Sequence, residues 1–209
     1  MFDSPFVRRV AVSMKLLGIA FEHRNWSVGK DFDAIRKFNP LGRVPTLVLD
    51  DGDALIDSSA ILDYIDGRTG PERALVPAAG GDRRATLRVM AIATGAAEKG
   101  REALYERVFR PAEKRYEPWI ERCLTQMHGA LAELDRLSAA CGAGNWFVGN
   151  RLTQADVTAT CMYTFLEEVL ALTPERAPYP ALRALTSRCE ALPQFSATRE
   201  PYSVPNPRG

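Results

Sequence analysis

Residues 39–65 carry the pattern that most narrows the possible folds, because a loop, a strand, a tight turn, a second strand and a helix are predicted there in immediate succession. Thr46–Leu49 is a β-rich apolar run, and Asp51-Gly52 is a dipeptide that two-residue hairpin turns prefer. A helix is expected to begin at Ser58, which can cap it, while Asp57 places a carboxylate at the positive end of the helix dipole. The stretch predicts a β-hairpin that leads directly into a helix.

Pro45 stands at the start of the first of these strands, where its missing N–H does not interrupt a sheet. The Val44–Pro45 bond is a candidate for the cis form, which would leave the N–H and C=O of Val44 free to bind the backbone of a ligand. A trans proline in an ordinary turn is the alternative, and the residues alone leave both open.

The N-terminal segment predicts a helix with a complete set of boundary signals. Ser4 is a favourable N-cap, Pro5 suits the first helical position and Gly18 is a stop signal. Apolar residues recur between them at helical spacing, at Val7, Val10, Met14 and Leu17. Phe21–Trp26 is expected to form a strand, and a short helix ending by Asn39-Pro40 should follow it. With the hairpin, the predicted order is β-α-β-α-β-β-α, in which only two or three residues before Ser4 are left for the first strand.

Composition limits the classes of protein to which the chain can belong. With 209 residues, of which 46% are hydrophobic and 25% charged, it can bury a core as one large domain or as two small ones. A net charge of +1 gives no reason to expect nucleic acid or an anionic membrane as a partner, and no apolar run reaches transmembrane length. The two histidines have no ligand spacing, so no metal site is expected. Four scattered cysteines without a CxxC pair suit a reducing compartment, and we expect a cytoplasmic protein.

The second half of the chain is expected to be helical. The stretch from Gly67 to Gly81 is rich in glycine and proline and predicts a linker. A long helix capped by Asp82 should follow it, and the small residues Gly95-Ala96-Ala97 in that helix suit either a dimer axis or a close crossing within the chain. Thr153 and Asp156 have the spacing of a reciprocal helix cap, and the helix from Ala155 to about Leu172 is apolar nearly all round, so it should be buried.

Two of these segments resemble glutathione transferases. In the first half the matching residues are Asn39-Pro40, Val44-Pro45-Thr46-Leu47, Asp51-Gly52 and Asp57-Ser58-Ser59-Ala60-Ile61, and in the second half they lie in Phe147–Asp156. The likeness is greatest to small bacterial members of the serine type. It implies an α/β thioredoxin-like domain over residues 1–66, a linker over 67–81 and an all-helical C-terminal domain over 82–209.

The same resemblance implies a glutathione site. Ser4 would be the catalytic residue and donate a hydrogen bond to the glutathione thiolate, although from the residues alone a plain helix cap is the simpler account of a serine there. Ser58 would bind the γ-glutamyl carboxylate and Asp57 the γ-glutamyl amine. Val44 would pair with the cysteinyl backbone of glutathione across the bond to Pro45.

Two basic residues fall where related enzymes bind the glycyl carboxylate of glutathione, namely Arg43 and Lys30. A solvated surface charge is an equally good account of Lys30. The second substrate would lie between the domains, against the helix from Met90 to Leu104 and residues such as Tyr105, Phe109 or Tyr116.

The implied function is a homodimeric glutathione transferase that conjugates the glutathione thiolate to a small electrophile, as in detoxification. A glutathione-dependent isomerase or dehalogenase on the same site is one alternative, and a non-catalytic glutathione- or ligand-binding protein is another. Glutaredoxin-like thiol reduction is disfavoured because no cysteine stands at position 4.

Overall fold

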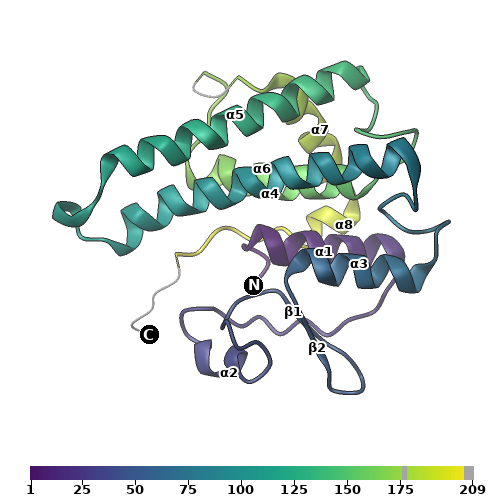
Figure 1. Ribbon diagram of the computed structural model, residues 1–209, viewed down its shortest axis with the longest axis horizontal. Helices are drawn as coiled ribbons and strands as arrows, with labels where there is room; N and C mark the ends of the chain where they lie inside the picture. Colours follow the sequence, from purple (N-terminus) through teal and green to yellow (C-terminus); the bar gives the residue numbers. More distant parts are fainter. Residues whose placement is uncertain (176–177, 205–209) are drawn as a thin grey trace.

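The computed structural model describes residues 1–175 and 178–204, and confirms an α/β domain followed by a helical domain. The first half contains α1 (Pro5–Leu17), α2 (Phe32–Arg36), β1 (Thr46–Val48), β2 (Ala54–Ile56) and α3 (Ser58–Thr69). The second half contains α4 (Gly80–Phe109), the 3-10 turn η1 (Ala112–Lys114), α5 (Glu117–Cys141), α6 (Gln154–Val169), α7 (Pro180–Glu190) and α8 (Pro193–Ser196). In Figure 1, α4 and α5 run side by side at one end of the molecule, the hairpin and α2 lie at the other, and α1 and α3 lie between. Residues 205–209 of the predicted helical domain lie outside the described residues.

Helix α1 joins the two halves of the molecule. It has the predicted boundaries, with Pro5 in its first turn and Gly18 closing it at a φ of 69°, a left-handed conformation that glycine adopts without strain. One face packs on α3 in a cluster that includes Val10, Met14, Leu17, Ile61, Leu62 and Ile65. Val12, on the opposite face, belongs to the core of the helical half.

The hairpin forms, but its loop differs from the prediction. β1 and β2 are antiparallel, with Leu47 opposite Leu55. The Leu49 N–H donates to the carbonyl of Asp53 (2.8 Å), which leaves three residues in the loop rather than two. A two-residue turn of the preferred type requires a positive φ at both central residues, whereas Gly52 alone has one here (φ 90°) and Asp51 does not.

The prediction of a strand over Phe21–Trp26 is wrong, because the structure has no strand there. No strand precedes Ser4 in the described residues either. The order is therefore α-α-β-β-α instead of β-α-β-α-β-β-α, although the hairpin and the helix that follows it are in place. β1 pairs with β2 on one side only. Its other edge faces a cavity of about 1050 Å³, and the 21–26 segment also lines that cavity.

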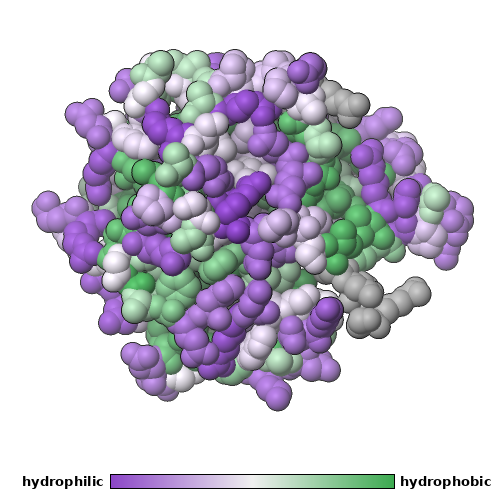
Figure 2. Space-filling model, turned by 180° about the vertical axis from the view of Figure 1, so that it is seen from behind, coloured by the Kyte–Doolittle hydropathy of each residue, from purple (hydrophilic) through white to green (hydrophobic). Residues whose placement is uncertain are grey.

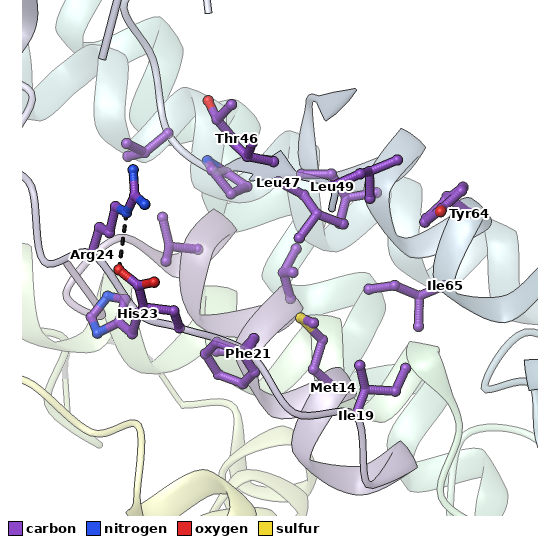
Figure 3. A pocket seen from close by; sticks show the side chains of 18 of the residues that line it. Met14, Ile19, Phe21, His23, Arg24, Thr46, Leu47, Leu49, Tyr64 and Ile65 are labelled. Atoms are coloured by element: carbon purple, nitrogen blue, oxygen red, sulfur yellow. Dashed lines mark hydrogen bonds and ion pairs between the residues drawn. The ribbon is translucent and has the colours of Figure 1, made fainter. Parts of the chain in front are cut away.

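Figure 3 shows this cavity from close by. Phe21, Ile19 and Met14 lie on one side of it, Leu47 and Leu49 on another, and Tyr64 and Ile65 of α3 close the end. A strand is held by the N–H and C=O groups of an adjacent strand about 4.8 Å away. Since a cavity separates Phe21–Trp26 from β1, the apolar pattern of this segment has no ladder to join.

Helix α6 is the centre of the helical half, as its sequence predicts. Each residue from Gln154 to Leu166 is buried. The predicted cap is present, because the Asp156 carboxylate accepts the N–H groups of Thr153 (2.8 Å) and Phe147 (2.9 Å), and the Thr153 hydroxyl accepts the N–H of Ala155 (3.3 Å).

Helix α4 starts earlier than predicted. Its first residue is Gly80, so Asp82 lies in the first turn instead of capping the helix. Ala96 and Ala97 are fully buried within the chain. At Gly100 a side chain would collide with Leu166 of α6, so the small residues of α4 provide a close intrachain crossing.

Polar contacts tie the two halves together. The Ser13 hydroxyl donates to Oε1 of Gln154 (2.8 Å), and the backbone N–H of Gln154 donates to the carbonyl of Leu75 (2.9 Å).

Within residues 1–175 and 178–204, none of the helices combines the length and hydrophobicity needed to cross a membrane.

Candidate functional site

A pocket of about 610 Å³ lies where the two halves meet. The first half contributes the start of α1 and the loop before β1, including Ser4, Phe6, Arg43 and Val44. The second half contributes α4 and several aromatic residues, including Arg101, Tyr105, Phe109, Trp119 and Phe165. The wall from the first half carries the Ser4 hydroxyl and the Arg43 guanidinium beside apolar side chains such as Phe6 and Val44, and we call it the polar wall. The wall from the second half is largely aromatic.

Ser4 lies at the N-terminus of α1 but does not cap it with its side chain. Its carbonyl accepts the first helical N–H, from Arg8 (2.9 Å), while its half-buried hydroxyl makes no hydrogen bond to any described residue. A free hydroxyl beside exposed helical N–H groups can stabilise an anion. The neighbouring Asp3 is buried, which raises the pKa of its carboxyl, and it accepts the N–H of Ser203 (3.1 Å).

The loop before β1 is held by Asn39. This buried side chain donates to the carbonyl of Arg43 (2.8 Å) and accepts the N–H of Leu41 (3.0 Å). The Val44–Pro45 bond that follows is cis, which confirms the first of the two alternatives left open by the sequence. The backbone N–H and C=O of Val44 have no hydrogen-bond partner among the described residues.

At the start of α3 the structure exchanges the predicted roles of two residues. Asp57, with a φ of 69°, is the N-cap and accepts the N–H of Ser59 (2.7 Å). Ser58 is the first helical residue, and its buried hydroxyl turns inward to accept two hydrogen bonds from Arg9, at 3.1 and 2.6 Å. Because the oxygen accepts both, the Ser58 hydroxyl proton is free to be donated to a ligand.

Arg9 is a buried residue behind the start of α3 that the helical spacing did not single out. It is 1% exposed, and it contacts the hydroxyls of Ser58 and Ser59 without any carboxylate partner among the described residues. Its Nη1 is buried without a hydrogen bond, and burial lowers the pKa of Arg9 to about 10. Its guanidinium lies 5.9 Å from the ring centroid of Phe6, on the pocket wall.

The adjacent arginine shows what a buried guanidinium normally needs. Arg8 forms a bidentate ion pair with Glu190 (2.7 and 2.6 Å) and also donates to the carbonyls of Phe195 and Thr198. Arg9 lacks such an anion. The carboxylates of Asp57 and Glu98 act to raise the pKa of Arg9, but neither forms an ion pair with it. A buried charge without a directly bound carboxylate is costly, so its presence behind the start of α3 is a feature expected of an anion-binding site.

The aromatic wall contains a second arginine that sequence analysis missed. Arg101 of α4 lies 5.8 Å from the ring centroid of Phe6 and 5.9 Å from that of Tyr105. Burial raises the pKa of Tyr105, while the charges of Arg101 and Arg43 oppose that shift. Arg101 lies on the helix that sequence analysis placed against the second substrate, but that prediction named no charged residue.

The structure gathers the sequence-predicted residues unevenly. Ser4, Arg43 and Val44 line the pocket, whereas Pro45 lines the neighbouring cavity. Asp57 and Ser58 line neither space, and Ser58 is connected to the pocket wall through Arg9 and Phe6.

Two predicted residues lie away from the pocket. Lys30 is exposed and lines neither space. Of the aromatic candidates, Tyr105 and Phe109 line the pocket, whereas Tyr116 is 65% exposed and does not. Across residues 1–175 and 178–204, no group of three His, Cys, Asp or Glu side chains has the arrangement of a metal site.

Solved structures of similar fold contain glutathione or a related ligand. A glutathione S-transferase from Methylobacterium radiotolerans, crystallised with glutathione sulfonate, is 29% identical with a TM-score of 0.87, and the match covers 97% of this chain and 92% of that one. A glutathione S-transferase from Methylobacillus flagellatus with glutathione bound is 28% identical with a TM-score of 0.86, covering 95% of this chain and 96% of that one.

Sequence comparison leads to the same family. The GST-like protein YibF of Escherichia coli is 29% identical over 134 residues, a match that spans 64% of this chain and 65% of that protein. The family model for the glutathione S-transferase N-terminal domain matches residues 1–73, and the model for the C-terminal domain matches residues 117–187. With both domain models matched in order and a fold that agrees with them, the chain belongs to the glutathione S-transferase family.

Proposed function

We propose that this protein is a glutathione transferase of the serine type, which transfers the glutathione thiolate to a small electrophile. The observation that carries the proposal is that α1 and α3 each begin with a serine whose hydroxyl does not cap its helix. Ser4 faces the pocket, and Ser58 is supported by Arg9. Two helix N-termini, each with a serine hydroxyl that is not used as the cap, suit a ligand that carries a thiolate at one position and a carboxylate at another.

In this proposal glutathione lies along the polar wall. The γ-glutamyl carboxylate accepts the Ser58 hydroxyl and the N–H groups at the start of α3, and Arg9 supplies the counter-charge behind them. Asp57 takes the γ-glutamyl amine. Val44 pairs its free N–H and C=O with the cysteinyl backbone of glutathione.

The glycyl carboxylate lies near Arg43. This arginine is exposed, lines the pocket and makes no ion pair within the described residues. Lys30 remains a peripheral cation in this proposal, since it lines neither cavity.

The chemical step follows from the position of Ser4. Its hydroxyl donates a hydrogen bond to the sulfur and so favours the thiolate over the thiol, and the dipole of α1 acts in the same direction. The thiolate then forms a sulfur–carbon bond to the electrophile, and a leaving group departs with the bonding electron pair. Where the electrophile is an activated alkene, the adjacent carbon takes up a proton instead.

Two variants separate an enzyme from a glutathione-binding protein. A charge-assisted hydrogen bond contributes about 1.5 to 3 kcal/mol, so Ser4→Ala should raise the pKa of bound glutathione by about one to two units and lower the transferase rate. Its affinity for glutathione at low pH, where the thiol is protonated, should change little. Asp57→Asn should weaken glutathione binding wherever the carboxylate of the parent is ionised and the γ-glutamyl amine is protonated, because it removes the charge that this amine binds.

Calorimetry and titration of the thiolate absorbance measure these effects. Tight glutathione binding in the parent, with no turnover of any electrophile and no thiolate shift in Ser4→Ala, would favour a non-catalytic carrier. Unchanged affinity in Asp57→Asn would refute the placement of the γ-glutamyl group. A glutathione-dependent isomerase or dehalogenase would instead show turnover without accumulation of a conjugate.

The proposal includes two assignments beyond the site. We place the protein in the cytoplasm, with which its four free cysteines, three of them buried, agree. We also propose a homodimer, for which a test is given below.

A further inference from the structure

We propose that the second substrate is a flat aromatic electrophile that carries a carboxylate, and that Arg101 selects it by pairing with that carboxylate. The inference rests on the proposed transferase function and adds the class of electrophile and the residue that recognises it.

Arg101 has no counter-ion among the described residues. Within residues 1–175 and 178–204 it makes neither an ion pair nor a hydrogen bond, and its guanidinium is held only by the rings of Phe6 and Tyr105. Other cations of the same region are neutralised, since Arg110 pairs with Glu106 (2.8 Å) and Lys99 with Glu102 (2.9 Å).

The pocket wall also contains three carboxyl groups, and none of them pairs with Arg101. Glu102 and Glu106 are taken up by those two ion pairs. Asp3, the third carboxyl on the wall, accepts the N–H of Ser203 and pairs with neither pocket arginine. The cationic side chains of the wall that make no ion pair among the described residues are therefore Arg43 and Arg101, and the proposed function already uses Arg43 for glutathione. Arg101 is the cation left for the second substrate, and a guanidinium matches a carboxylate with two parallel hydrogen bonds.

The shape of the pocket suits a flat aromatic ligand. Tyr105 and Phe109 form an edge-to-face pair, with ring centroids 4.9 Å apart, on the same helix as Arg101. Phe165 and Trp119 complete the aromatic wall, and a pocket of about 610 Å³ is of a size usual for small-molecule sites. Seen from behind in Figure 2, hydrophobic residues also gather on the side of the molecule where the α4–α5 connection lies. A flat aromatic ring can pack against these aromatic side chains, and a carboxylate on its edge can pair with Arg101.

The test compares two electrophiles that share one ring and one leaving group but differ in the charge of one substituent, 4-chloro-3,5-dinitrobenzoate and its methyl ester. In each the thiolate sulfur bonds to the ring carbon and chloride leaves with the bonding electron pair. Each enzymatic kcat/KM is divided by the rate constant of the same compound with free glutathione, which corrects for the activating effect of the ester. The proteins are the parent, Arg101→Gln, Arg101→Lys and Arg107→Gln, the last being an exposed arginine of the same helix that does not line the pocket.

We expect the parent to prefer the benzoate by about tenfold or more, chiefly through a lower KM, because an ion pair with the substrate forms on binding. Arg101→Gln should reduce this preference to near one by weakening only the benzoate reaction. Arg101→Lys should keep part of it, and Arg107→Gln should retain all of it.

Each remaining outcome counts against the proposal. If the parent turns over both compounds without preference, or if Arg101→Gln keeps the preference, Arg101 is not the selecting residue. If Arg101→Gln lowers both reactions equally, the residue supports the pocket without recognising a carboxylate. If the parent binds glutathione but turns over neither compound, the class of electrophile proposed here is wrong, and the thiolate titration of Ser4→Ala then shows whether the transferase function fails with it. Circular dichroism of each variant identifies any that does not fold.

Discussion

Replacing Arg9 by methionine should separate the binding role of this residue from any role in the fold. Methionine keeps most of the length and the apolar stem of the side chain, but it removes the charge that lies buried behind Ser58. In the free protein the Arg9 guanidinium has two hydroxyl partners and no carboxylate among the described residues. The substitution should therefore act on the ligand and on the fold in different directions.

The size of the effect on binding follows from the lost interaction. Hydrogen bonds that involve a charged group contribute about 1.5 to 3 kcal/mol, so the Kd for glutathione should rise by about 10- to 150-fold. The effect on the fold should be small or favourable, because removal of a buried charge that has no ion-pair partner among the described residues offsets the loss of the hydrogen bonds to Ser58 and Ser59 and of the attraction to Asp57. The lowered pKa of Arg9, caused by burial, has the sign expected of a charge that costs folding free energy.

Arg8→Met is the matched control. Arg8 is adjacent, equally buried and bound to Glu190, so its loss leaves that carboxylate without its partner. We expect a loss of about 3 kcal/mol in the free energy of unfolding, with glutathione affinity retained in the folded fraction. The two measurements are urea unfolding without ligand and calorimetry with glutathione. If Arg9→Met binds glutathione within twofold of the parent, Arg9 is not part of the anion site, and if it unfolds as readily as Arg8→Met, its role is structural.

Two further predictions concern pH and assembly. Burial acts to raise the pKa of Glu190, but hydrogen bonds from Arg8 and Thr164 outweigh it, and the pKa is lowered. The Arg8–Glu190 ion pair should therefore stabilise the fold above about pH 4.5, and this contribution should be lost as the pH falls through the lowered pKa. Urea unfolding at a series of pH values should show a shallower loss in acid for Glu190→Gln, and an unchanged slope would contradict the assignment. For the homodimer, Ala96 and Ala97 are buried within the chain, so the axis should use the exposed side of α4 near Leu87, which is 42% exposed. Sedimentation should give a dimer for the parent at micromolar concentration and a folded monomer for Leu87→Arg, whereas a monomeric parent would refute the dimer.

Features that depend on nearby residues could be predicted from the sequence. The start and end of α1 follow from Pro5 and Gly18, and the reciprocal bonds between Thr153 and Asp156 at the start of α6 follow from their spacing, because these partners lie within five residues of each other. The position of Ser4 at a helix start is of the same kind. Whether its hydroxyl caps the helix or faces a pocket could not be predicted, since both outcomes require the same local sequence.

Features that depend on a distant partner could not be predicted in this way. Phe21–Trp26 has the composition of a strand, but a strand also needs an adjacent strand, and here a cavity occupies that place. The exchange of roles at the start of α3 has a similar cause. Ser58 would be a good cap by itself, but its hydroxyl is taken by Arg9, which is 49 residues away in the chain.

Arg8 and Arg9 show most directly why the site could only be partly predicted. The two are adjacent, identical in type and both buried, and a helical pattern assigns them only to different faces of α1. Their difference lies in what each face meets: Arg8 meets Glu190, 182 residues along the chain, and Arg9 meets two hydroxyls at the start of α3. A buried arginine that forms an ion pair with a carboxylate of the same protein, as Arg8 does, is already neutralised and attracts a ligand anion only weakly. One that forms no such pair retains its charge for an anion from outside, so the missing partner of Arg9 is what indicates its function.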